Sequence, residues 1–332
     1  MKRFLALWTA AVLLLSAPAL AQEDTDKDEA ARRAAASAVE LSTDETMTDL
    51  EKLTALHDWL ALNCDYGLAP DNETAYGALI RGEAVCRGYA EGMACLASAA
   101  GLDGAATYSE DMDHAWILAT LEGERYFCDC TWDDGKYEKL GLIRHRFWLF
   151  DEESAWALLH YGWDSGEAVP GGDLEAAPWG AAVTRVIFSG DWAYYIDGDF
   201  RLMRCDRGTW ATEELRSFDE RWPDLDPEDG KEPEIYSGLS LIGGRLYFNT
   251  PREILSVDLE GNDLRTELAP DLDGRLVYGT AVREGRLRYS LAAGPGDPDY
   301  EVLDAGVAAW DAWGCPRLSL GERILSAVRA LV

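Results

Sequence analysis

The sequence predicts an α+β protein in which a unit of helices and a small sheet precedes a β-rich unit. In the first unit, apolar residues recur at the spacing of an amphipathic helix up to about Asn63. From about residue 185, short aromatic strands alternate with turns that contain Gly or Asp, as in antiparallel sheets. The stretch SGEAVPGGD lies between the helical pattern and the strand pattern, so we expect the domain boundary there.

The N-terminus has the features of a secretory signal peptide. Lys2 and Arg3 precede an apolar run over residues 4–20, and small residues lead up to Ala21. The run is about as short as a spanning helix can be, which favours cleavage after Ala21 over a retained anchor. We therefore expect a secreted or extracytoplasmic protein that has no membrane span after cleavage.

The chain is strongly acidic, with 30 basic and 61 acidic residues and a formal net charge of −31. Such a surface repels phosphate backbones and anionic membranes. Nucleic acid is therefore excluded as an expected partner.

Four segments follow from these patterns. Residues 1–21 form the signal peptide. Residues 22–45 are charged and alanine-rich, and we expect a flexible leader or a frayed helix there. Residues 46–170 form the mixed domain, and residues 180–332 form a β-rich, repeat-like domain.

Three segments of the β-rich half resemble one another. Each contains a strand, a turn, an aromatic strand and a further strand, and the aromatic strands are centred on Tyr194, Tyr247 and Tyr289. Their spacing of about 40 to 50 residues is typical of propeller blades. Three blades do not close a ring. We therefore expect a truncated or irregular propeller-like unit or a stack of antiparallel sheets, and the alternative is a set of unrelated hairpins.

The cysteines predict neither a metal site nor a cofactor. Zinc ligands usually come as two close pairs, whereas only Cys128 and Cys130 are close together here, with one residue between them. On a strand both would point away from Asp129, in poor geometry for a disulfide with each other. If a bridge forms, Cys64 and Cys95 are the candidate partners. The seven cysteines are Cys64, Cys86, Cys95, Cys128, Cys130, Cys205 and Cys315.

Cys86 is the candidate nucleophile. It follows the turn at Gly82 and lies in the first turn of a helix expected over about residues 84–100. The free N–H groups of a first turn favour thiolate over thiol and can hold an oxyanion. A buried structural thiol is the alternative from this local context.

Among the four histidines, His114 is the best placed to act as a base, because it begins a predicted strand and can lean over a cleft. His57 lies among the leucines of the first helix, where packing is the simpler interpretation. His145 stands between two arginines, which oppose its charging, and His160 follows a predicted helix and has a structural interpretation.

A predicted hairpin, with strands over residues 115–121 and 125–131, connects this base to an acid. If Leu121 and Glu124 close the turn, His114 and Asp129 lie on one face as a diagonal pair about 7 Å apart at the backbone. Asp129 can then accept from one imidazole nitrogen and leave the other for the thiol. A register shifted by two residues would separate them.

Four stretches of the mixed domain follow, in order, the pattern of a known family. They are ALHDWLALNCDYG, TAYGALIRGEAVCRGYAEGMACLASAAGL, DHAWILATLEGERYFCDCTWDDG and FWLFDEES, within about residues 48–165. In them the chain resembles bacterial transglutaminase-like domains, which belong to the papain-related cysteine acyl-transfer superfamily. The resemblance implies a papain-like fold with Cys86 as nucleophile, His114 as base and Asp129 as orienting acid. The chain departs from the family pattern at Ile117, where many relatives have asparagine.

The resemblance also implies an activity, namely thioester formation with release of an amine or ammonia, followed by transfer to water or to an amine. The expected protein is a cysteine-dependent acyl-transferase, peptidase or amidase that acts on a peptide or protein substrate. We expect the β-rich half to position that substrate or to bind a partner. The alternative is a catalytically silent binding or scaffold module with the same fold.

Overall fold

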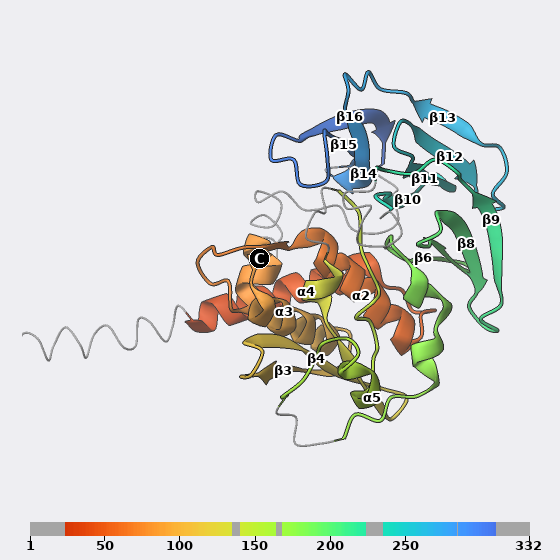
Figure 1. Ribbon diagram of the computed structural model, residues 1–332. Coiled ribbons are helices and arrows are strands. Elements are labelled where there is room, and N and C mark those ends of the chain that lie inside the picture. The colour runs from red at the N-terminus through yellow and green to blue at the C-terminus, as the bar shows by residue number, and fades with distance from the viewer. Residues whose placement is uncertain (1–23, 135–139, 164–167, 224–234, 284, 310–332) are drawn as a thin grey trace, which may run out of the picture.

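The computed structural model describes residues 24–134, 140–163, 168–223, 235–283 and 285–309 (Figure 1). The predicted signal peptide and Cys315 lie outside these residues. Within the described ranges, no helix is both long and apolar enough to cross a membrane.

Two helices form the centre of the first half. The first, α2 (Asp49–Asn63), begins with a capping box, in which Thr48 accepts from the N–H of Glu51 and the Glu51 carboxylate accepts from the N–H of Thr48. The second, α3 (Cys86–Ala99), lies beside it and ends just before Gly101, as predicted. A short π-helical turn (Gly77–Arg81) and the parallel strands β1 (Asp65–Tyr66) and β2 (Glu83–Ala84) connect the two helices.

Residues 24–42 form a helix, so the prediction of a flexible leader is wrong for them and its helical alternative is the better description. One stripe of that helix is fully buried, because Ala31, Ala35 and Ala38 pack into the same core as α2 and α3. Lys27 adds an ion pair with Asp71, at 3.0 Å. Each alanine side chain is small and only weakly hydrophobic, so the sequence gives a weak amphipathic pattern here. The same small size allows close helix packing.

A three-stranded antiparallel sheet covers α3, in the order β3-β4-β5 (Figure 1). Its strands are β3 (Asp103–Ser109), β4 (His114–Leu121) and β5 (Glu124–Cys128). Short helices follow it, and these are α4 (Cys130–Asp133), α5 (Glu152–Ala155) and the 3₁₀ turns Asp173–Ala176 and Pro178–Ala181.

The described residues of the second half form three antiparallel meanders, and the predicted antiparallel-sheet region is confirmed. Tyr194, Tyr247 and Tyr289 lie on the second strand of their respective meanders. Among the described residues these sheets do not close into a barrel or propeller. The strands are β6 (Ile187–Ser189), β7 (Trp192–Ile196), β8 (Arg201–Asp206), β9 (Thr212–Ser217), β10 (Leu239–Ile242), β11 (Arg245–Asn249), β12 (Ile254–Asp258), β13 (Arg265–Leu268), β14 (Leu276–Arg283), β15 (Arg286–Ala292) and β16 (Glu301–Ala308).

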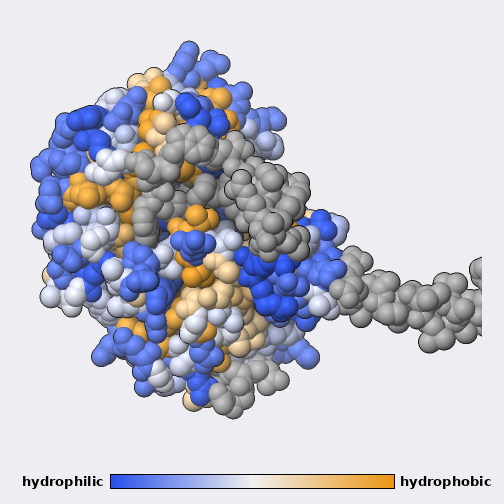
Figure 2. Space-filling view, turned by 180° about the vertical axis from the view of Figure 1, so that it is seen from behind, coloured by the Kyte–Doolittle hydropathy of each residue, from blue (hydrophilic) through white to orange (hydrophobic). Residues whose placement is uncertain are grey.

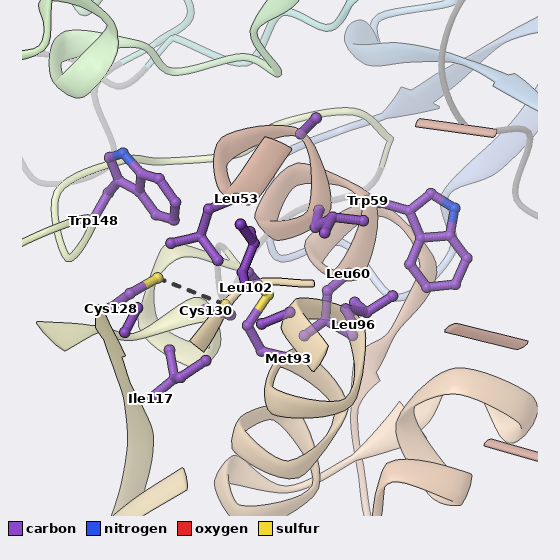
Figure 3. Close-up of a cluster of buried hydrophobic side chains, with 14 of the residues drawn as sticks. Leu53, Trp59, Leu60, Met93, Leu96, Leu102, Ile117, Cys128, Cys130 and Trp148 are labelled. Atoms are coloured by element: carbon purple, nitrogen blue, oxygen red, sulfur yellow. Dashed lines mark hydrogen bonds between the residues drawn. The ribbon is translucent and has the colours of Figure 1, made fainter. Parts of the chain in front are cut away.

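The largest core runs from the first half into the first meander. Leu53 and Met93 are fully buried in it (Figure 3), and so are Trp179 and Cys205. Burying a large apolar side chain contributes roughly 1.5–3 kcal/mol, so this shared core fixes the first meander against the helices. Hydrophilic residues cover much of the face in Figure 2, in keeping with the acidic composition.

Candidate active site

Cys86 is the first residue of α3, and it is partly exposed. Its N-cap residue, Val85, has no side-chain acceptor, so no side chain caps the N–H groups of the first turn. Gly82 before it has a φ of 70°, in the left-handed region that favours glycine. A Cβ on Gly88 would lie 2.2 Å from the backbone oxygen of Asn72, so only glycine allows this approach. These features place the thiol at the uncapped end of a helix.

The hairpin register that the sequence predicts is confirmed, because Leu121 pairs with Glu124 and Ile117 pairs with Cys128. The second strand is shorter than predicted, since β5 ends at Cys128 and Cys130 already belongs to α4. Asp129 lies between the two elements as the N-cap of α4.

Asp129 is fully buried, and both of its carboxylate oxygens are engaged. Oδ1 accepts from the N–H groups of Thr131 and Trp132, at 2.9 and 3.2 Å. Oδ2 faces Nε2 of His114 at 2.7 Å and Nε2 of His160 at 3.0 Å. Burial raises the pKa of Asp129, but the hydrogen bonds and charges of the two histidines outweigh it and lower the pKa. The group therefore stays ionised and holds two imidazoles in place.

His114 uses Nε2 for Asp129, which leaves Nδ1 for the thiol. Burial lowers the pKa of His114, but hydrogen bonds and charge interactions with Asp129 and Cys86 raise it to about 9. The ring of Trp132 stacks on the imidazole, with centroids 4.8 Å apart and planes 22° apart. This stacking and the carboxylate together restrict the ring to one orientation.

His114 also changes the pKa of the Cys86 thiol. Burial raises the pKa of Cys86, but the hydrogen bond and charge of His114 and the N–H groups of Ala115 and Arg87 lower it overall. Cys95, by contrast, is a partly exposed thiol whose pKa is raised, chiefly by burial. Cys86 therefore carries thiolate at a lower pH than Cys95 does.

His160 is a functional candidate that the sequence interpretation missed. It is fully buried, with Nε2 on Asp129 and Nδ1 at 2.8 Å from the backbone oxygen of Leu158. Both ring nitrogens therefore have a hydrogen-bond partner. His160 is 31 residues from Asp129 in the chain, and no local pattern in the sequence connects them.

Two hollows flank Tyr66, whose side chain lines both. One has a volume of ≈ 560 Å³ and contains Cys86, and the other has ≈ 510 Å³ and contains His114. Tyr66 is 62 % exposed. Burial raises its pKa, and the charges of Cys86 and Asp113 raise it further. The sequence interpretation gave Tyr66 no role, so it missed this residue. Charged residues that line the first hollow are Glu73, Arg87, Glu91 and Asp113.

Ile117, where the chain departs from the family, does not face this site. It is 1 % exposed, and its side chain belongs to the core formed with α2 and α3 (Figure 3). Because side chains alternate along β4, Ile117 points to the opposite face from His114. The residue therefore packs beneath the sheet.

The remaining histidines, His57 and His145, lie together in a second buried cluster with Asp58. Three buried groups of side chains in the described residues have the composition of metal ligands. They are His57 with Cys128 and Cys130, His57 with Asp58 and His145, and His114 with Asp129 and His160.

The structure thus brings Cys86, His114 and Asp129 together, and it keeps Cys128 and Cys130 on the core side, as predicted. The catalytic roles of the three residues stay predictions. None of the six described cysteines is in a disulfide, Cys64 and Cys95 included.

A thiol on a helix N-terminus, an imidazole on the adjacent sheet and a carboxylate just beyond the end of that sheet define a papain-like arrangement. Residues 33–127 match the family model of the transglutaminase-like superfamily. The chain therefore contains a transglutaminase-like domain. The match includes Cys86 and His114 and ends two residues before Asp129.

Curated proteins give no match, whereas solved structures give distant ones. A nidogen/laminin complex chain is 13% identical, with a TM-score of 0.22 over 39% of this chain and 51% of that one. The computationally designed Ika4 protein is 10% identical, with a TM-score of 0.24 over 57% of this chain and 84% of that one. PorZ, a surface component of the type-IX secretion system of Porphyromonas gingivalis, is 14% identical, with a TM-score of 0.23 over 63% of this chain and 20% of that one. This chain thus spans about half of the first structure's chain, and the low TM-scores carry no argument about fold.

Proposed function

We propose that this protein is an exported transglutaminase-like cysteine acyl-transferase or hydrolase that acts on amide bonds of peptides or proteins. The observation that carries the proposal is the chain of interactions from Cys86 through His114 to Asp129. It lowers the pKa of the thiol and raises the pKa of the imidazole to about 9. A thiolate and an imidazolium are the protonation states that acyl transfer from an amide requires.

In the first stage, the Cys86 thiolate attacks the amide carbon and forms the carbon–sulfur bond. The uncapped N–H groups at the start of α3 stabilise the oxyanion. His114 gives its proton to the leaving nitrogen, the carbon–nitrogen bond breaks, and an amine or ammonia departs.

In the second stage, water or a primary amine attacks the thioester, and His114 takes the proton of the attacking group. The carbon–sulfur bond breaks and the thiolate returns. Water gives a peptidase or amidase, and an amine gives a transferase. The hollow around Cys86 has three carboxylates and one guanidinium, a balance that attracts cationic amines.

The test is alkylation of the full chain with iodoacetamide near neutral pH, with the modified cysteines mapped by mass spectrometry. Cys86 should react faster than Cys95, because the pKa of Cys86 is lowered and that of Cys95 is raised. His114→Ala should slow the labelling of Cys86 and leave that of Cys95 unchanged. Equal rates at the two cysteines would favour the silent binding module.

A set of Gln-containing peptides, offered with and without a primary amine, then separates transfer from hydrolysis. Cys86→Ala is the control, and it should lower either activity by about 10⁴-fold or more.

Export is tested separately. The chain produced in a secreting bacterial host should begin at Gln22, whereas an intact N-terminus on the recovered protein would contradict cleavage after Ala21.

A further inference from the structure

Beneath the candidate active site, the described residues bury three groups that have the composition of metal ligands, and two of these groups are explained without a metal. In the first, Asp129 Oδ2 lies 2.7 and 3.0 Å from its two histidines. In the second, Asp58 Oδ1 lies 3.0 Å from Nδ1 of His57 and 2.8 Å from Nε2 of His145. These are hydrogen-bond lengths, and they leave no space for an ion between the atoms.

The third group, His57 with Cys128 and Cys130, is different. Its ligand atoms all lie within 4.8 Å of one another. Figure 3 shows the two sulfurs side by side, one at the end of β5 and the other at the start of α4, 3.9 Å apart. That separation is about twice a disulfide bond. The two cysteines therefore form no disulfide, and one thiol donates a hydrogen bond to the other, which Figure 3 marks with a dashed line.

Asp133 is the candidate for a fourth ligand, and it lies next to the three-residue group through its contact with His57. Its Oδ2 lies 3.3 Å from Nε2 of His57, yet the two are not aligned for a hydrogen bond, and neither atom has a hydrogen-bond partner. Both side chains are fully buried. The two atoms form a buried ion pair, but without an aligned hydrogen bond their burial is poorly compensated.

Two of these distances match edges of a zinc tetrahedron. Zinc binds sulfur at about 2.3 Å and nitrogen or oxygen at about 2.0–2.2 Å. Tetrahedral angles then set about 3.8 Å between two sulfurs and about 3.3–3.5 Å between a nitrogen and an oxygen. The observed separations are 3.9 Å between the sulfurs and 3.3 Å between His57 and Asp133.

The surroundings also prepare the ligands. Asp58 faces Nδ1 of His57, which directs the lone pair of Nε2 at the cluster once that nitrogen loses its proton. Asp58 is held in turn by His145 and by the N–H of Val186 at 2.7 Å. The other oxygen of Asp133 accepts from the N–H of Phe147 at 3.0 Å. Imidazole and carboxylate ligands of zinc are usually supported by partners of this kind.

We propose that His57, Cys128, Cys130 and Asp133 form a structural zinc site. Binding replaces the protons of the two thiols and of Nε2 of His57, and these protons leave to solvent. Since all four side chains are buried, the ion enters as the domain folds and exchanges slowly afterwards. It fixes the residues on both sides of Asp129 and so supports the turn that carries this carboxylate.

The short Cys-x-Cys spacing disfavoured zinc in the sequence interpretation, which placed both thiols on one strand. The strand instead ends at Cys128, and Cys130 begins a helix. This change of direction brings the two sulfurs together. His57 comes from α2, far earlier in the chain, so no sequence spacing shows it as a ligand.

To test this proposal, the full chain is purified with a reductant and without chelators. Its metal content is then measured by elemental mass spectrometry. We expect about one zinc per chain, with X-ray absorption that shows two sulfur and two nitrogen or oxygen neighbours. Cys130→Ser should lose the ion. Cys205→Ser, which alters a buried free thiol on β8, should keep it.

A chelator should remove the ion rapidly only after the protein is unfolded. Cobalt in place of zinc should give a thiolate-to-metal charge-transfer band, which needs no variant and remains informative if Cys130→Ser does not fold. Metal-free wild type, zinc bound without sulfur neighbours, or a disulfide between Cys128 and Cys130 would overturn the proposal. Cys86→Ala should retain zinc, so the result does not depend on whether the protein is an enzyme.

Discussion

Each half of the molecule contains a fully buried side chain that joins separate segments, and the two differ in charge. In the first half this side chain is Asp58, which contacts His57, His145 and the N–H of Val186. In the second half it is Asn249. Its oxygen accepts from the N–H of Gly238 at 3.0 Å and from the Thr280 hydroxyl at 3.3 Å, and its nitrogen donates to the backbone oxygen of Tyr236.

The difference shows where the molecule keeps its histidines. All four histidines of the chain lie between residues 57 and 160, and all are buried. In the meanders, the buried network around Asn249 uses a neutral amide and hydroxyl groups. Neutral hydrogen bonds join segments without a buried charge. The buried ionisable groups of the first half therefore need a functional explanation. We propose two such functions, acid–base chemistry and metal binding.

The largest expected effect is a loss of folding stability on substitution of Asp58. Asp58→Asn removes a buried carboxylate that faces two imidazoles, and breaking such a pair costs about 3–5 kcal/mol in the free energy of unfolding. Chemical denaturation of the full chain measures this loss.

Asn249→Ala is the matched change in the second half, and it should cost about 1–3 kcal/mol, the usual penalty for unpaired buried polar groups. It should also leave the alkylation rate of Cys86 unchanged. Equal losses of stability in the two variants would show that the charge of the first network has no special weight.

A smaller effect, on rate, is expected at Asp129. Asp129→Asn keeps an oxygen for His114 but removes the negative charge, and we expect the rate of acyl transfer to fall about a hundredfold, or about 2.7 kcal/mol.

The pH profile of the same variant is the sharper measurement. In the wild type, the rate should fall as the pH rises through about 9, where His114 loses its proton. Asp129 is one of the groups that raise this pKa, so the alkaline limb should move to lower pH in Asp129→Asn. An unchanged limb would show that the carboxylate does not act through His114.

Much of this site was predictable because it depends on local rules. Alternation along a two-stranded hairpin, with the turn placed at residues 121 and 124, gave the pairing that the structure shows. The glycine turn before Cys86 and the apolar spacing after it placed the thiol on a helix N-terminus. The recurring aromatic strands located the three meanders.

The rest depends on contacts between distant segments, and local patterns do not contain them. His57 seemed to be a packing residue, because only the fold brings Asp133 and the two cysteines to it. The helix over residues 24–42 was expected only as a frayed alternative to a flexible leader, because its buried stripe consists of alanines. His160 reaches Asp129 only through the loop that follows α5.

The smallest effect is expected at His160, which we infer to be a positioning residue. His160→Ala removes one of the two imidazoles on Oδ2 of Asp129, so the carboxylate is held less firmly and its pKa rises. We expect kcat to fall about tenfold, or about 1.4 kcal/mol, with KM unchanged, because His160 lines neither hollow. His160→Gln keeps an N–H donor without the imidazole ring and should recover part of the rate. A change in KM alone, or a Gln variant as slow as the Ala variant despite equal stability, would show that His160 contributes only to packing.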